Sequence, residues 1–226
     1  MSDEPLEGAA PGPRTAAGRR GRLPRERERA TVQPMAEPEH RALLLEAIGI
    51  EAAAQQALLR GDAAVARARF QAAADRYRAS WEVAPPRSFG RLVGMVKAGV
   101  LAGHGGEEAA YVRRALEEGC DSPPSCYALA IAALVQGDDD AAREAAAGMR
   151  TEDPAFARTA AAIDALARGD GDGYAAAVHG IVADFEAREH HLTGVAFADT
   201  AVMLERLAAA RDLAAKPASS LMPVLG

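Results

Sequence analysis

Apolar residues recur along most of the chain at the three- and four-residue steps of an amphipathic helix, and short polar or glycine-containing segments separate these stretches. Phe70, Ala74, Tyr77 and Trp81 form one such stripe, at steps of four, three and four. The alternation that marks a strand never continues for more than three or four residues. We therefore predict an all-α fold of about nine helices. Their expected ranges are about 38–60, 62–82, 88–103, 107–118, 122–136, 139–150, 153–168, 173–190 and 194–214.

One phrase, Ala-Leu-x-x-Gly-Asp, occurs three times, at residues 57–62, 133–138 and 165–170. In each copy an apolar helix ends, glycine takes the left-handed cap, and aspartate is placed to cap the next helix. The last two copies start 32 residues apart and the first two 76 residues apart. Repeats of this length are typical of stacked helical hairpins, so we expect antiparallel hairpins in a repeat array.

The segment from about 123 to 154 resembles a tetratricopeptide repeat (TPR), and looser copies extend the resemblance over about 140 residues. The resemblance implies a right-handed stack whose concave groove receives a peptide or a partner helix. Small residues occupy three places where the family usually has a large aromatic: Cys126, Ala133 and Ala146. The residues that carry the resemblance lie at the inter-helix turn, at the close approach of the paired helices and at the start of the next unit: Gly137-Asp138, Ala130 with Ala142, and Asp153-Pro154.

The chain divides into three parts. Residues 1–36 are rich in Pro, Gly, Arg and Glu and have few large apolar side chains, so we expect disorder there. Met35 begins a stretch that looks like a natural protein start, and residues 1–34 would then be an over-extended start. The alternative is a basic tail that contacts an acidic partner or nucleic acid, because residues 14–29 contain seven arginines and two glutamates. Residues 37–216 form the predicted TPR-like domain, and 217–226 a short tail, either docked or frayed.

The rest of the chain is acidic on balance, within a net charge of −6, which argues against nucleic-acid binding by the folded part. We see no signal peptide and no run that approaches 18 apolar residues, so we expect a cytoplasmic protein with no membrane partner. In that reducing compartment Cys120 and Cys126 should be free thiols. They could form a disulfide under oxidising conditions.

Acidic and histidine side chains lie close together in the sequence near residue 190. Glu186 and His190 are four residues apart and would share a helix face, with His191 beside them and Asp199 on the next helix. Such a set could bind a divalent metal. The favoured alternative is a helix C-terminus carrying histidines, which the helix dipole stabilises. We therefore predict no metal site, and keep Glu186, His190 and His191 as the candidates should one exist.

Other motifs are incomplete. Residues 170–173 begin like a calcium loop, but Tyr174 and Ile181 stand where oxygen ligands belong, so a turn and a helix cap are expected. The glycine-rich segment around His104 lacks the Lys-Ser/Thr ending of a phosphate-binding loop and is interpreted as a loop. We therefore predict no catalytic residues and no cofactor.

The favoured function is a non-enzymatic interaction module for a peptide or partner protein. Two alternatives remain open. The first is an immunity protein that neutralises a bacterial toxin, because the order of helices resembles all-helical immunity proteins of polymorphic toxin systems, with Gly-Asp-Gly-Tyr before an amphipathic helix and a Pro-terminated tail. The second is a metal-dependent enzyme that uses the Glu/His cluster.

Overall fold

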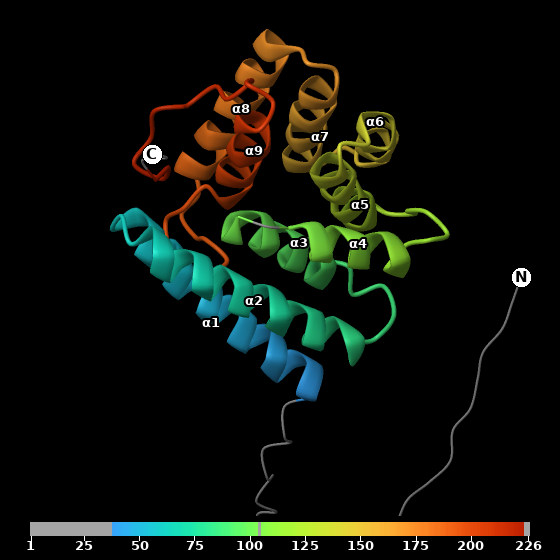
Figure 1. The fold of residues 1–226 in the computed structure, drawn as a ribbon, viewed down its shortest axis with the longest axis vertical. Coiled ribbons are helices and arrows are strands. Elements are labelled where there is room, and N and C mark those ends of the chain that lie inside the picture. The colour runs from blue at the N-terminus through green and yellow to red at the C-terminus, as the bar shows by residue number, and fades with distance from the viewer. Residues whose placement is uncertain (1–37, 104, 224–226) are drawn as a thin grey trace, which may run out of the picture. The chain divides into compact units, whose positions relative to one another are not determined.

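The computed structural model describes residues 38–103 and 105–223, and across these ranges it contains nine α-helices and no strand (Figure 1). The all-α prediction is therefore confirmed. The expectations for residues 1–36 and for His104 lie outside the described residues. The helices are α1 (Glu39–Leu59), α2 (Ala63–Glu82), α3 (Gly90–Ala102), α4 (Gly106–Ala115), α5 (Pro123–Gln136), α6 (Asp139–Gly148), α7 (Pro154–Ala167), α8 (Gly171–Glu186) and α9 (Asp199–Ala209).

The recurring Ala-Leu-x-x-Gly-Asp phrase has the local structure that its residues predict. Its glycines, Gly61, Gly137 and Gly169, all have left-handed backbones, with φ of 84°, 73° and 68°. Two of the three aspartates cap the next helix: Asp138 accepts a hydrogen bond from the Ala141 amide, and Asp170 accepts one from the Gly173 amide. Asp62 makes no side-chain cap bond to α2. Asp170 thus serves as a helix cap, as expected of the calcium-like segment.

The last two helices are shorter than predicted. α8 ends at Glu186 instead of 190, and α9 covers Asp199–Ala209 instead of about 194–214. The end of α9 has a clear cause, because Asp212 takes a left-handed backbone (φ 58°) and the Leu213 amide donates back to the Ala208 carbonyl at 2.9 Å. The chain between α8 and α9 is therefore a long non-helical connection, residues 187–198.

Small residues let the helices approach closely. The core is mostly alanine, valine and leucine, with few aromatic rings. Gly94 of α3 lies against the ring of Tyr77 on α2, where an added Cβ would stand 2.8 Å from the ring carbons. Consecutive helices along the chain pack side by side, α1 with α2 most extensively (Figure 1).

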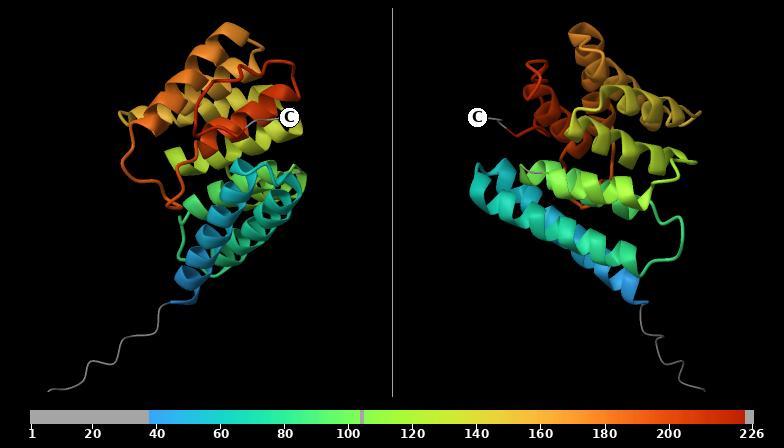
Figure 2. Two further views of the ribbon diagram at one scale, coloured as in Figure 1. Left: turned by 90° about the vertical axis from the view of Figure 1, so that its left-hand side faces the viewer. Right: turned by 45° about the vertical axis from the view of Figure 1, so that its right-hand side comes forward.

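The C-terminal helix does not simply continue this succession, because α9 packs against α3, α7 and α8 (Figure 2). One arginine on α9 and one just beyond its end reach the C-terminal ends of two earlier helices. Arg206 donates to the Leu101 carbonyl of α3, and Arg211 donates to the Leu134 carbonyl of α5 at 2.7 Å. Both carbonyls lie in the last turn of their helix, and that of Leu134 also accepts the Gly137 amide at 3.2 Å. α9 therefore lies on a face formed by the odd-numbered helices α3, α5 and α7.

The C-terminal tail follows α9 back onto the domain. The Ala198 amide donates to the Leu221 carbonyl at 3.1 Å, and the Leu221 side chain is buried. Of the two expectations for the tail, docking holds for residues 217–223.

Cys120 and Cys126 form a disulfide, so the expectation of two free thiols is wrong. The tight turn between them supplies the geometry. Ser122 caps α5 in a reciprocal pair of bonds with Ser125, and this brings the two cysteine Cα atoms to 4.9 Å. That separation is within the normal range for a disulfide.

Among the described helices, α1 alone is long and apolar enough to cross a membrane by length and composition, with a mean hydropathy of 1.4 over its best window. Packed core helices meet the same criterion. In this structure α1 packs along α2, and the Tyr77 hydroxyl of α2 donates to Glu51 in the middle of α1 at 2.6 Å.

Candidate functional site

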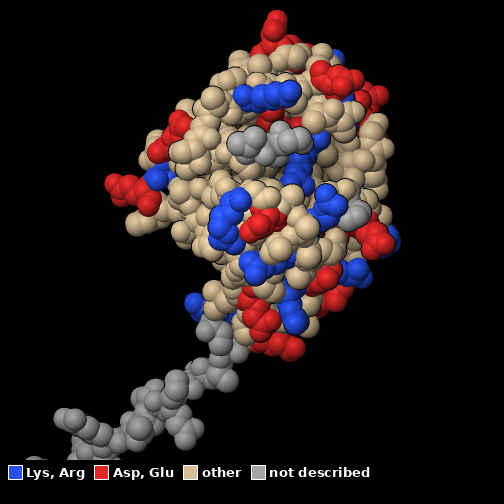
Figure 3. Space-filling view, turned by 60° about the vertical axis from the view of Figure 1, so that its left-hand side comes forward, with Lys and Arg blue, Asp and Glu red and all other residues tan. Residues whose placement is uncertain are grey.

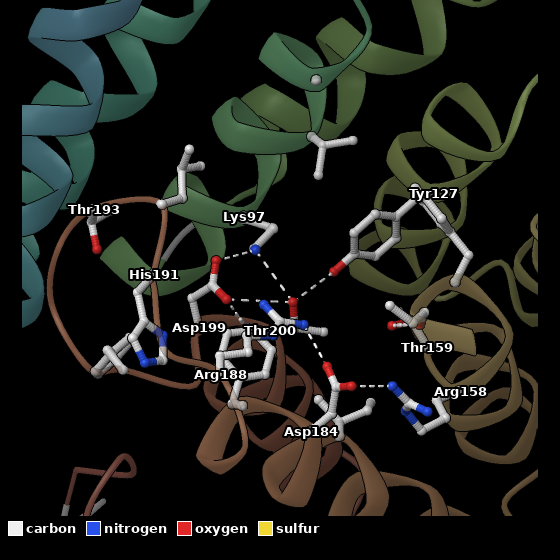
Figure 4. Close-up of a pocket in the computed structure, with 18 of the residues that line it drawn as sticks. Lys97, Tyr127, Arg158, Thr159, Asp184, Arg188, His191, Thr193, Asp199 and Thr200 are labelled. Atoms are coloured by element: carbon white, nitrogen blue, oxygen red, sulfur yellow. Dashed lines mark hydrogen bonds and ion pairs between the residues drawn. The ribbon is translucent and has the colours of Figure 1, made fainter. Parts of the chain in front are cut away.

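A cavity of about 360 Å³ opens between α3, α5, α7, α8 and the connection that leads into α9 (Figure 4). This volume lies within the range of small ligand pockets. Its wall combines aromatic rings with charged and hydroxyl groups. The side chains that define it are Lys97, Tyr127, Phe156, Arg158, Thr159, Asp184, Phe185, Arg188, His191, Phe197, Asp199 and Thr200.

An ion pair between α3 and α9 forms one end of the cavity. The Lys97 ammonium donates to the Asp199 carboxylate and, at 3.3 Å, to the Thr200 hydroxyl. Only 11% of the Lys97 side chain and 19% of the Asp199 side chain are exposed. Burial alone would lower the pKa of Lys97, but the negative charge of Asp199 raises this pKa above its ordinary value. Lys97 is therefore a cation. The Thr200 hydroxyl that accepts from Lys97 also accepts a hydrogen bond from the Tyr127 hydroxyl at 3.4 Å.

A second polar group lies behind the ion pair. Glu51 of α1 is 4% exposed and accepts hydrogen bonds from Tyr77 at 2.6 Å and Gln55 at 3.3 Å. Burial and the charge of Asp199 raise the pKa of Glu51, although Lys97 and both hydrogen bonds act in the opposite direction.

The connection between α8 and α9 is fastened to this buried group. Thr193 donates to the Gln55 side-chain oxygen at 2.6 Å, and the Gln55 side-chain amide donates in turn to Glu51. These hydrogen bonds thus join α1, α2 and the connection that lines the cavity.

The opposite rim carries two arginines on one carboxylate. Asp184 of α8 accepts from Arg158 of α7 through one oxygen and from Arg188 through the other, the latter at 2.6 Å. Two positive charges against one negative charge leave the rim positive. Both arginine side chains are about one-third exposed, so an anionic group of a ligand can reach this rim.

Aromatic rings supply the apolar part of the wall. Phe156 meets Tyr127 edge to face, with ring centres 6.4 Å apart. The Phe185 ring has two neighbours. The Arg188 guanidinium lies 3.8 Å from its centre, and the His191 ring stacks on it with ring centres 6.1 Å apart. Such a surface suits an apolar or aromatic group better than a small ion.

The predicted metal candidates are not brought together. α8 ends at Glu186, so His190 does not share a helix face with it, and the expectation of a histidine-bearing helix end there is wrong as well. Glu186 accepts a hydrogen bond from Ser219 at 2.7 Å, and His190 is exposed. Within the described ranges, no group of three or more His, Cys, Asp or Glu side chains is placed to hold a metal ion.

The candidate His191 and the nearby Asp199 do line the cavity, in other roles. Asp199 pairs with Lys97, and His191 stacks on Phe185 with its buried Nδ1 atom unbonded to any described group. Sequence reasoning missed Lys97 altogether. A usable signal was present, because Lys97 is the single charged residue in the apolar helix from Leu92 to Ala102.

Comparisons of the chain with protein-family models, with curated proteins and with solved structures found no match. The function is therefore argued from the site alone.

Proposed function

We propose that the chain is a non-enzymatic binding protein that recognises a peptide segment or a partner protein through the cavity between α3, α5, α7 and α8. The observation that carries this proposal is the cavity wall, in which aromatic rings lie beside charged groups that are already paired. A side chain of a partner can bury apolar surface there without leaving a buried charge alone.

The proposal includes a TPR-like repeat, supported by the left-handed glycines between helices and by the packing of consecutive helices. In such an array the ligand occupies the face of the odd-numbered helices. Here α9 already lies on part of that face, held by Lys97, Arg206 and Arg211. The open part is the cavity, so we assign binding to the cavity rather than to the whole groove.

The positive charge of the rim indicates which kind of partner segment binds there. Because Arg158 and Arg188 share the single carboxylate of Asp184, the rim attracts an acidic group. The segment that fits best has an apolar or aromatic side chain next to an acidic one.

The experiment compares two alanine-to-tryptophan variants on the same helix. Ala155 lines the cavity, so Ala155→Trp fills it, whereas Ala161 is exposed and is absent from the cavity wall. Each tagged protein is used to capture partners from its native lysate, and bound proteins are identified by mass spectrometry. We expect a stoichiometric partner with the wild type and with Ala161→Trp, and its loss with Ala155→Trp. A partner that binds all three proteins equally would contradict the assignment to the cavity.

A further inference from the structure

α1 has an exposed apolar face in addition to the face that it buries. Six residues follow one another on it at steps of three, four, three, four and three. Five of the six are exposed and one is half-buried, and the two leucines are 54% and 38% exposed. We call this row the α1 seam: Ala42, Leu45, Gly49, Ala52, Gln56 and Leu59.

The spacing of the seam is that of the a and d positions of a coiled coil, continued over six such positions. None of the six seam residues is charged. Of the two glutamates between Ala42 and Leu59, Glu46 is exposed and pairs with Arg76 of α2, and Glu51 is buried against Tyr77. The first helix of a helical array normally needs a polar outer face. An uncharged seam there favours a further helix packed against it.

We propose that the α1 seam is the interface of a homodimer, in which α1 packs antiparallel against α1 of a second copy. The register follows from pairing each a position with a d position. Ala42 then lies opposite Leu59 of the second copy, Leu45 opposite Gln56, and Gly49 opposite Ala52. The outer layers combine a small or polar residue with a leucine, and the central layer of Gly49 and Ala52 lets the two backbones approach closely.

The flanking charges select the antiparallel direction. Glu39 is the first residue of α1 and Arg60 directly follows its last, and both are exposed beside the ends of the seam. In the antiparallel register Glu39 faces Arg60 of the second copy, and this pair occurs twice by symmetry. In a parallel dimer each Arg60 would instead lie level with Arg60 of the second copy. The contact of Arg60 with Asp62 at 3.7 Å leaves 58% of the arginine side chain exposed for this role.

The test is sedimentation equilibrium of the full chain and of two leucine-to-glutamate variants. Leu45→Glu places a charge inside the seam, whereas Leu192→Glu makes the same change at a residue that is 80% exposed and outside the seam. We expect a dimer for the wild type and for Leu192→Glu, and association weakened at least about tenfold by Leu45→Glu. Circular dichroism of each variant verifies that its helices are retained.

A charge exchange tests the direction of packing independently of stability. Arg60→Glu alone should weaken the dimer, because Glu39 then faces a glutamate, and adding Glu39→Arg should restore it. A wild-type chain that stays monomeric, a dimer that Leu45→Glu leaves intact, or a charge exchange that fails to restore association each overturns the proposal. A monomer that binds vesicles of phosphatidylcholine and phosphatidylserine through the seam, and loses binding in Leu45→Glu, also overturns it in favour of a lipid surface.

Discussion

Removing one partner of the Lys97–Asp199 ion pair should destabilise the protein far more than removing one partner of an exposed ion pair. It joins α3 to the first residue of α9 across 102 positions of sequence, and its side chains are only 11% and 19% exposed. Lys97→Met keeps a side chain of similar length and leaves Asp199 as a buried charge without its cation. Breaking a buried pair in this way costs about 3–5 kcal/mol.

The matched control is the Arg87–Asp121 pair, whose side chains are 63% and 58% exposed. Arg87→Met makes an equivalent change there, and an exposed pair contributes only about 0–1 kcal/mol. The two methionine variants therefore compare the loss of a cation from a buried pair with its loss from an exposed one.

The assay is urea unfolding at neutral pH, followed by circular dichroism at 222 nm, for Lys97→Met, Asp199→Asn, the double variant and Arg87→Met. We expect each single change at the buried pair to lower the free energy of unfolding by about 3–5 kcal/mol. The double variant should lose much less than the sum, because neither charge is then left alone. A cost below about 1 kcal/mol for Lys97→Met, or additive single effects, would refute the reasoning.

Two further predictions concern the pH dependence of stability and the disulfide. The pKa of Glu51 in the folded protein is raised above its unfolded value near 4.5, so the stability that the protonated form contributes is complete below that value and is lost as pH rises through the folded pKa. Glu51→Gln should reduce this loss, measured as the urea midpoint between pH 4.5 and 8. The same pH dependence of the midpoint in both proteins would contradict this prediction. Cys120 and Cys126 are only six residues apart, so replacing both by serine should lower the free energy of unfolding by about 2 kcal/mol, measured without reductant. Adding reductant should destabilise the wild type and leave the serine variant unchanged; an equal response of both would contradict a disulfide.

The helices could be predicted because their signals are local. Gly137 and Asp138 end one helix and begin the next through bonds to residues three to five positions away, so the sequence around them is sufficient. Where a helix end depends on the fold, the prediction failed. The periodicity of α8 gave no reason to stop at Glu186, and residues 187–198 leave the helix to reach the buried network around Gln55.

The cavity could not be predicted because its parts are distant in the sequence. Asp199 was noted only as a neighbour of the histidines, yet its partner, Lys97, is on α3. The disulfide was missed for a different reason. Free thiols were predicted from the expected compartment, whereas the Ser122 cap between Cys120 and Cys126 sets the separation of the two cysteines directly.

Binding at the cavity is tested most directly by nuclear magnetic resonance. Isotope-labelled protein is titrated with the partner segment that the wild type captures and Ala155→Trp does not. We predict that the largest chemical-shift changes occur at cavity residues, among them Tyr127, Thr159 and Thr200. Shift changes confined to α2, α4 and α6, with the cavity resonances unmoved, would contradict it.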